Sequence, residues 1–413
     1  MQFCRINVCV TLFLVSLTFA SKLAAETEFL ALQKRVTDIY ERYSDAVVRV
    51  KAYSKVADAD AGAEGVRISV KIGSGFFISN EGLILVNASR VADAERVVIE
   101  HRGTDYLANI VGMDEQINVA LLKAEFLPDE FEFVRMNDAT QLPSTGTLAV
   151  SISCPFTFSP APRLTMVVGQ DTKFLQRLFP TTYLRVDHQL SKGEGGGPII
   201  DLQGRLIGML IVSIQETVAS YALPARAINK VKDDLLLEGR VVYASVGVEV
   251  EQHSLRGGES RVIVKAVNPE SPADLAGIIP GDIVQRVGDY SINDISDFPN
   301  AMFFIRVGEF VTFELDRDGT AMEMNRQTVV RPSDEPFIEI KPLTRQEAEL
   351  LVEDASGSET SEKPEQPQDE PGMPEPKPEV KGDEATSTTT IEEIPDAFSV
   401  DKDKPGPVLA IEE

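Results

Sequence analysis

Hydrophobic and polar positions follow two different periods along this chain. From Glu26 to Ser44, apolar residues recur at steps of three and four, which predicts an amphipathic helix. Between Val66 and about Leu236, short apolar runs are separated by turn residues, a pattern that indicates an all-β sandwich or barrel. Ala225–Glu238 returns to the helical period, so we expect a helix that closes this domain near Gly239. The predicted strands are 47–53, 68–72, 75–78, 83–86, 97–100, 110–111, 119–122, 148–152, 165–168, 183–186, 199–200 and 206–211.

A second unit of mixed pattern runs from Val246 to Arg331. Ser271-Pro272 has the residue types that favour an N-cap and the first position of a helix. Asp318-Gly319 favours a tight hairpin turn. We therefore predict a small α+β domain. Its predicted elements are strands 246–250, 262–267 and 283–287, a helix from 271, a helix over 296–305, and a hairpin of 311–316 with 321–330.

The two ends of the chain differ from these units. Residues 1–25 have the pattern of a secretory signal peptide, in which Arg5 precedes the apolar run Ile6–Ala20. This run is shorter than a membrane-spanning helix requires, although an uncleaved N-terminal anchor stays open as an alternative. From Glu353 onward, 18 acidic and 5 basic side chains supply −13 of the net charge of −25. We expect 334–413 to be a linker and a disordered, acidic, Pro-rich tail, used as a spacer or as a functional segment.

Composition excludes several classes of function. The acidic balance disfavours nucleic acid as a partner, because nucleic-acid binding needs a basic surface. Only Cys154 lies beyond the predicted signal, so an intrachain disulfide is not possible there. An export signal without disulfides fits a bacterial periplasm or cell envelope. Metal-ligand spacings, phosphate-binding loops and dinucleotide fingerprints are all missing from the sequence, so we predict no cofactor and no metal.

One stretch has the outline of a protease nucleophile loop. From Asp187 to Pro198, a glycine-dense turn leads into an apolar strand. Four other segments stand in order around it: Gly73-Ser74-Gly75-Phe76 followed by 81–87, then 118–123, Cys154-Pro155-Phe156 and 201–208. With these segments, the chain from about Val47 to Pro332 resembles the HtrA/Deg serine proteases. The resemblance implies a mainly β protein, in which a chymotrypsin-like double β-barrel (26–240, with the N-terminal helix) is followed by one α+β PDZ domain (241–333).

The three catalytic positions of that family hold other residues in this chain. When the matching segments are placed in this order, Ser89 stands at the histidine position, Asn118 at the aspartate position and Gly195 at the serine position. Hydrolysis by this route needs a hydroxyl nucleophile, an imidazole base and a carboxylate that orients the base. In the former oxyanion loop, Gly193 is followed by Glu194, whose carboxylate would repel a developing oxyanion. A Glu194 turned to solvent is the alternative.

Other side chains are not expected to restore this chemistry. We expect His101, His188 and His253 to lie at the surface, away from Ser89. Cys154 is expected to be a small buried residue and not a nucleophile.

The resemblance implies a peptide site in the second unit. Ser245-Val246-Gly247-Val248 looks like a carboxylate-binding loop, and the strand through Val250 would pair with a peptide by strand addition. The helix that carries Phe298, Ala301, Met302 and Ile305 would form the opposite wall. The predicted peptide-binding residues are Ser245, Val246, Gly247, Val248, Val250, Phe298 and Met302.

The sequence therefore predicts an HtrA/Deg-like pseudoprotease of the cell envelope. It would bind exposed C-termini or unfolded segments as a scaffold, a chaperone-like protein or a regulatory partner. One alternative is an active serine endopeptidase in envelope protein quality control, and another is a structural oligomer without peptide binding. The resemblance also suggests a homotrimer or a mixed oligomer with an active paralogue.

Overall fold

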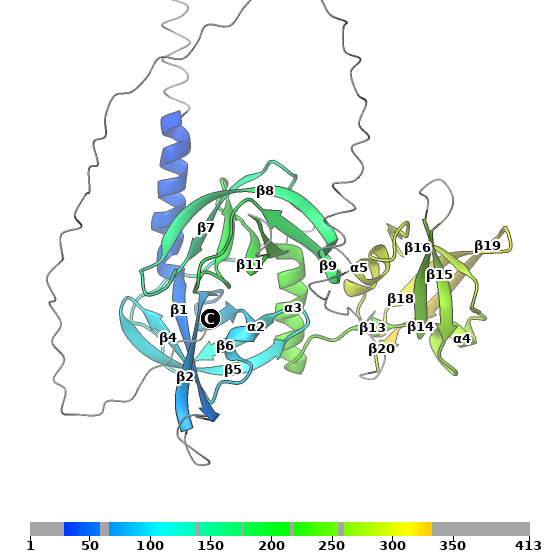
Figure 1. The fold of residues 1–413 in the computed structure, drawn as a ribbon, viewed down its shortest axis with the longest axis horizontal. Helices are drawn as coiled ribbons and strands as arrows, with labels where there is room; N and C mark the ends of the chain where they lie inside the picture. The colour runs from blue at the N-terminus through cyan, green and yellow to red at the C-terminus, as the bar shows by residue number, and fades with distance from the viewer. Residues whose placement is uncertain are drawn as a thin grey trace, which may run out of the picture. The chain divides into compact units, whose positions relative to one another are not determined.

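A computed structural model describes residues 29–57, 66–136, 141–174, 177–214, 219–254 and 260–332. The predictions of a signal peptide over 1–25 and of a tail over 334–413 therefore lie outside the described residues. Among the residues that the structure describes, no helix is long and apolar enough to cross a membrane. The described elements form two β-barrels and a smaller α+β domain (Figure 1).

The first barrel follows the N-terminal helix. Residues 29–43 are helical, and the 3-10 turn η1 (Ser44–Ala46) leads into the barrel. Its strands close in the order β1-β2-β3-β6-β5-β4, all paired antiparallel, around a core that includes Val50, Phe77 and Ile84. The short helix α2 (Ala88–Val91) follows β3. The strands are β1 (Val47–Ala57), β2 (Val66–Phe77), β3 (Leu83–Val86), β4 (Arg96–His101), β5 (Thr104–Asp114) and β6 (Val119–Ala124).

The second barrel has the order β10-β11-β12-β9-β8-β7 and is closed in the same way. Helix α3 (Ala225–Glu238) follows it and contacts strands of both barrels. Ile228, Val231 and Leu235 of α3 are fully buried in the apolar cluster between the barrels. The strands are β7 (Leu148–Ser153), β8 (Ala161–Phe174), β9 (Arg177–Val186), β10 (Pro198–Asp201), β11 (Leu206–Ile214) and β12 (Ala219–Pro224).

The third part has its own apolar core and one main sheet in the order β14-β15-β16-β18-β19. Strand β14 is at the edge of this sheet. The Ser271 hydroxyl caps α4 by accepting a hydrogen bond from the Asp274 N–H at 3.3 Å. The elements are β13 (Ala244–Ser245), β14 (Val248–Ser254), β15 (Ser260–Val267), α4 (Pro272–Leu275), β16 (Ile283–Val287), β17 (Tyr290–Ser291), α5 (Asp297–Phe303), β18 (Phe310–Arg317), β19 (Thr320–Gln327) and β20 (Val329–Val330).

The mainly β class, the double barrel and the α+β domain are confirmed, and three details of the elements are corrected. The predicted strands 68–72 and 75–78 are one strand, β2, because β1 pairs with it without interruption. Strand β12 was not predicted. The strand predicted over 246–250 begins only at Val248, because Gly247 has a left-handed φ of 82° and turns the chain before it.

Helix α5 is held against strand β9 of the second barrel. The Asn300 side-chain oxygen accepts hydrogen bonds from the Thr181 hydroxyl at 3.0 Å, the Thr182 N–H at 2.9 Å and the Thr182 hydroxyl at 3.0 Å. Phe303, at the end of α5, is buried in the same apolar cluster as the barrel interior. One face of this short helix is therefore part of the contact with the barrel.

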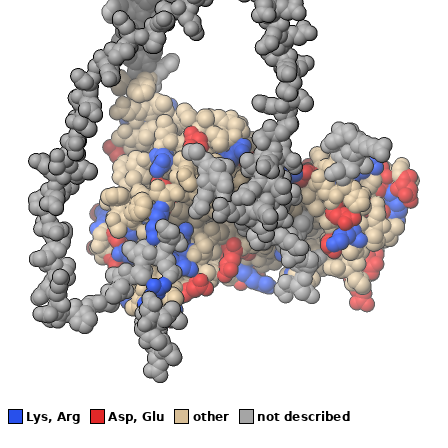
Figure 2. All heavy atoms as spheres, in the orientation of Figure 1, with Lys and Arg blue, Asp and Glu red and all other residues tan. Residues whose placement is uncertain are grey.

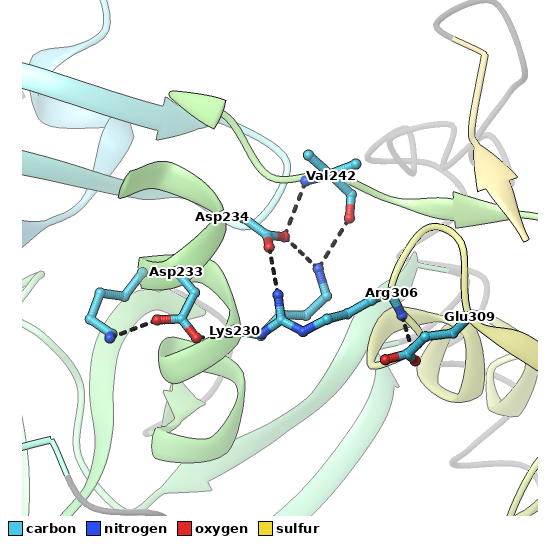
Figure 3. Close-up of polar contacts among 7 residues, drawn as sticks. Lys230, Asp233, Asp234, Val242, Arg306 and Glu309 are labelled. Carbon is cyan, nitrogen blue, oxygen red and sulfur yellow. Dashed lines mark hydrogen bonds and ion pairs between the residues drawn. The ribbon is translucent and has the colours of Figure 1, made fainter. Parts of the chain in front are cut away.

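A second set of polar contacts joins α3 to the segment after α5 (Figure 3). The Arg306 guanidinium lies 3.4 Å from an Asp233 oxygen and 3.5 Å from an Asp234 oxygen. Asp234 also pairs with Lys230 at 2.6 Å, and the Lys230 ammonium donates to the Val242 carbonyl. Because Lys230 and Asp234 are nearly buried, this cluster is shielded from solvent more than an ordinary surface ion pair.

Charges of both signs are spread over the surface. On the face shown in Figure 2, Lys and Arg side chains are interspersed with Asp and Glu side chains. More than half of the net charge of −25 belongs to residues from 353 onward. The net charge of the chain therefore does not indicate an acidic face on the barrels.

Candidate functional site

The glycine-rich turn of the predicted nucleophile loop is held by backbone atoms. The Gly195 carbonyl accepts from the Ser74 N–H at 2.9 Å, the Gly196 N–H donates to the Leu210 carbonyl at 2.8 Å, and the Leu210 N–H donates to the Gly197 carbonyl at 2.9 Å. Gly196 has a φ of 95°, and a Cβ atom there would lie 2.0 Å from the Ser74 carbonyl oxygen. Only glycine fits this position, whatever the chemistry of the loop.

An amide group stands where a side chain at position 195 would enter. A Cβ atom added to Gly195 would lie 2.8 Å from Asn87 Nδ2. This amide nitrogen donates to the Ile211 carbonyl at 2.8 Å, and Asn87 is only 1% exposed. Its Oδ1 atom has no hydrogen-bond partner among the described residues. Asn87 belongs to the segment 81–87 on which the resemblance rests, but its position against Gly195 was not predicted.

The structure brings two of the three positions that were predicted to correspond to the catalytic triad into contact. Asn118 Oδ1 accepts a hydrogen bond from the Ser89 N–H at 2.8 Å. Asn118 has a left-handed φ of 61°, a conformation that asparagine tolerates better than most residues. Ser89 is exposed on α2, two residues after Asn87. The contact is made by the Ser89 backbone N–H and not by its hydroxyl, which cannot act as a base near neutral pH.

Glu194 is turned into the protein. It is 4% exposed, one carboxylate oxygen lies 3.4 Å from Arg163 Nη2, and the other accepts from the Ser191 N–H at 2.5 Å. The alternative in which Glu194 points to solvent is therefore wrong. Gly193, one residue earlier, has a φ of 92°, and a Cβ atom there would lie 2.6 Å from the Cys154 carbonyl. The loop is thus fixed on one side by the ion pair of buried Glu194 with exposed Arg163, and on the other by close backbone approach.

A polar cluster near Glu194 joins buried Thr165 and His188 to exposed Asp187. The Thr165 hydroxyl donates to Asp187 at 2.7 Å and lies 3.1 Å from His188 Nδ1. Burial lowers the pKa of His188, and the Arg163 guanidinium acts in the same direction, while Glu194 and Asp187 oppose them. The expectation that His188 is a surface residue is wrong, because it is 7% exposed. The neutral imidazole of His188 is therefore the favoured form in the folded protein near neutral pH.

The remaining candidate side chains each pair with a carboxylate or are buried. His101 is 3% exposed and lies 3.0 Å from Asp45, so the prediction of a surface residue is wrong for it too. His253 is exposed, as expected, and lies 2.8 Å from Glu251. Cys154 is buried, and burial raises the pKa of its thiol to about 12, so that the thiolate is not formed near neutral pH.

A groove of about 770 Å³ lies between β14 and α5. Of the predicted peptide-binding residues, six line it: Ser245, Val246, Val248, Val250, Phe298 and Met302. Gly247 lies between the lining residues of the loop, whereas Ala301 and Ile305 do not line the groove. Sequence reasoning missed Pro180, Tyr243 and Arg331, which come from outside the predicted loop and helix and have no local signal.

The loop at the end of the groove has a fixed backbone. The Val246 carbonyl accepts from the Ala273 N–H at 2.9 Å, and the Gly247 carbonyl accepts from the Asn268 N–H at 2.8 Å. A Cβ atom at Gly247 would lie 2.3 Å from the Ser271 Cβ, so the position requires glycine. Among the described residues, no strand pairs with the outer edge of β14, so this edge could accept a further strand.

Comparison with known protein families agrees with this architecture. Residues 73–209 match the model of a trypsin-like peptidase domain, and residues 244–327 match that of a PDZ domain. The chain is an HtrA-type protein. It is 28% identical over 279 residues to a probable periplasmic serine endoprotease DegP-like of Marinomonas sp., which covers 64% of this chain and 58% of the relative. A protein with the same description from Brucella suis is 26% identical over 274 residues, covering 63% of this chain and 53% of the relative. The HtrA-type chain thus spans little more than half the length of these relatives.

Solved structures show the same fold as this HtrA-type protein. The HtrA-type protease AlgW with decapeptide has a TM-score of 0.59 and 20% identity, and the match covers 72% of this chain and 99% of that one. The serine endoprotease from Yersinia pestis has a TM-score of 0.52 and 23% identity, covering 72% and 98%. At this level of identity, the likeness concerns the fold alone.

Proposed function

We propose that this HtrA-type protein binds peptides without cleaving them. The observation that carries the proposal is the absence of a nucleophile at Gly195, together with the Asn87 amide that stands in the place of a side chain there. Ser89 adds a hydroxyl where an imidazole would be needed to accept a proton. With neither nucleophile nor base, the cleft has no route to an acyl-enzyme. The barrel would then serve as a frame for recognition.

Recognition would take place in the groove between β14 and α5. A bound peptide would add to the outer edge of β14, with its apolar side chains against Val248, Phe298 and Met302. The backbone N–H groups of the loop 246–248 would receive a terminal carboxylate. We therefore propose exposed C-termini or unfolded protein segments as ligands, and a scaffold, chaperone-like or regulatory role.

The proposed location is the periplasm or cell envelope of a bacterium. The support for it is the signal-like pattern of residues 1–25 and the description of relatives as periplasmic. A homotrimer or a mixed oligomer with an active paralogue is a prediction from the family resemblance. Native mass spectrometry of the protein purified alone, and after co-expression with an active relative, would measure both.

Catalytic inactivity is tested with a fluorophosphonate probe and a casein turnover assay. The purified chain is expected to give no labelling and no turnover, while an active HtrA protease treated in parallel gives both. The same purification from cells that carry an empty vector is the control for contaminating protease. Turnover or labelling that survives repurification of the wild-type chain would support an active endopeptidase and refute the proposal.

Peptide binding is tested with a library of fluorescent decapeptides whose last four residues are random, each made as free acid and as amide. The full chain is expected to bind a subset that ends in an apolar residue. Val248→Lys should abolish this binding, because it places a charge in the apolar groove. Val111→Lys, at an exposed valine of the first barrel, is the matched control and should bind as wild type does. No binding by any peptide would favour a purely structural role.

A further inference from the structure

The carboxylate-binding loop of the groove has one of its donors already occupied. The Gly247 N–H donates to the side-chain oxygen of Ser245 at 2.9 Å. Ser245 is 7% exposed and lines the groove, so this hydrogen bond lies at the end where a peptide terminus would arrive. The serine hydroxyl therefore stands in the acceptor position that a carboxylate oxygen would take.

The backbone of this loop cannot turn the Gly247 N–H toward a different acceptor. The carbonyls on either side are held by the N–H groups of Ala273 and Asn268, and Ser271 packs against the Gly247 Cα. The Ser245 side chain, in contrast, has a χ1 torsion that can change rotamer. When a ligand binds to this N–H, the hydroxyl is the group that moves.

We propose that Ser245 is an internal competitor of the peptide carboxylate for the Gly247 N–H. This proposal rests on the proposed function, because it concerns the same groove. A carboxylate is the stronger acceptor, since its hydrogen bonds are charge-assisted. It displaces the hydroxyl, and the ligand loses the free energy of one neutral hydrogen bond in doing so. Ser245 thus weakens the binding of free C-termini and hastens their release.

The size of the effect follows from the type of bond. A neutral hydrogen bond that is already made in the free protein reduces ligand affinity by about 2- to 10-fold. Ser245→Ala should therefore bind a free-acid decapeptide about 2- to 10-fold more tightly than the wild type. Ser245→Thr keeps the hydroxyl and should bind within about 2-fold of the wild type.

The experiment uses the full chain and the tightest free-acid decapeptide from the library, with its amide as control. Dissociation constants are measured by fluorescence anisotropy for the wild type, Ser245→Ala and Ser245→Thr. Amide proton shifts of Gly247 are followed by NMR, independently of affinity. In the ligand-free proteins, the Gly247 proton should shift upfield in Ser245→Ala, because the hydroxyl acceptor is lost. In the peptide-bound proteins, the shifts should converge.

The outcomes separate this proposal from the proposed function. If the free acid binds no better than the amide, the carboxylate recognition in the proposed function fails. If the free acid binds better than the amide, but Ser245→Ala binds it no more tightly than the wild type, the competition by Ser245 is refuted and the proposed function stands. An unchanged Gly247 shift in free Ser245→Ala would also refute the competition.

Discussion

A serine placed at position 195 tests whether the position predicted for the nucleophile has room for a side chain. The Cβ atom of Gly195→Ser would lie 2.8 Å from Asn87 Nδ2, closer than such contacts allow, so the amide must move. Its hydrogen bond to the Ile211 carbonyl would then be lost inside the protein. An unsatisfied buried polar group costs about 1–3 kcal/mol. For a domain of this size, that corresponds to a fall in Tm of about 2–12 °C.

A double-mutant cycle isolates this cause. Urea unfolding is followed by circular dichroism for the wild type, Gly195→Ser, Asn87→Ala and the double variant. Asn87→Ala removes the obstructing amide, and the Ile211 carbonyl oxygen, 3.9 Å from the added Cβ, is then at an ordinary contact distance. Gly195→Ser should therefore cost about 1–3 kcal/mol in the wild-type background and close to zero in the Asn87→Ala background. An equal cost in both backgrounds would refute the steric explanation.

The same variant tests the chemistry. Gly195→Ser should remain without peptidase activity, because position 89 offers a hydroxyl and not an imidazole. Incubation with a fluorophosphonate probe, followed by mass spectrometry of the intact protein, measures phosphonylation of the serine with loss of fluoride directly. A stoichiometric adduct on the introduced serine would mean that another group in the cleft acts as the base.

Three further predictions concern the same barrels. Gly196 and Gly146 both have φ values near 90°, but only at Gly196 would a Cβ atom lie 2.0 Å from the Ser74 carbonyl oxygen. Gly146→Ala should therefore cost only the conformational strain of about 1–2 kcal/mol, while Gly196→Ala should lower the urea midpoint much further. Equal urea midpoints for the two variants would contradict this. Because burial lowers the pKa of His188 below its ordinary 6.5, the unfolded chain takes up the proton first as the pH falls. The wild type should therefore lose unfolding free energy from pH 6.5 down to the lower native pKa, and His188→Gln should lack this contribution; parallel pH profiles of the two proteins would refute it. Because Cys154 is buried and its thiol pKa is raised to about 12, it should resist thiol reagents at pH 8 in the folded protein and react after unfolding. Rapid labelling of the folded protein would contradict its burial.

Local sequence patterns were most successful for elements whose ends are set by residues close by in the sequence. Helix α3 has the predicted bounds, 225–238, because its apolar stripe is regular and Gly239 adopts the left-handed conformation that ends a helix. The predicted cap at Ser271 is also present. The turn at Asp318-Gly319 has positive φ at both residues, as the sequence indicated. In each case, the deciding interaction lies within a few residues of the chain.

Features that depend on distant partners were harder to predict. The closure of β1 onto β4 and the pairing of β12 with β9 join segments far apart in sequence. Burial of His101 depends on Asp45, 56 residues earlier, so no local pattern distinguishes it from a surface histidine. Tertiary contacts override the polar character that suggested exposure.

In the candidate site, too, some residues were found from the sequence and other contacts are seen only in the structure. Ser89, Asn118 and Gly195 were located through the order of family-like segments, and their loss of catalytic function stays a prediction. Arg163, the partner of Glu194, lies 31 residues away on strand β8 and has no signal in the sequence. The Asn87 amide at Gly195 depends on the packing of β3 against the turn, which only coordinates reveal.

The contact between α5 and the barrel has a consequence for work with fragments. A fragment of residues 241–333 would carry Phe303 without the apolar cluster that buries it, and Asn300 without the threonines that bond to it. Pro180, which lines the groove from β9, would be missing as well. Such a fragment would expose an aromatic ring that favours self-association, and its groove would be open on one side. Ligands selected on the excised domain would then be selected for a different surface from the one that the whole chain presents.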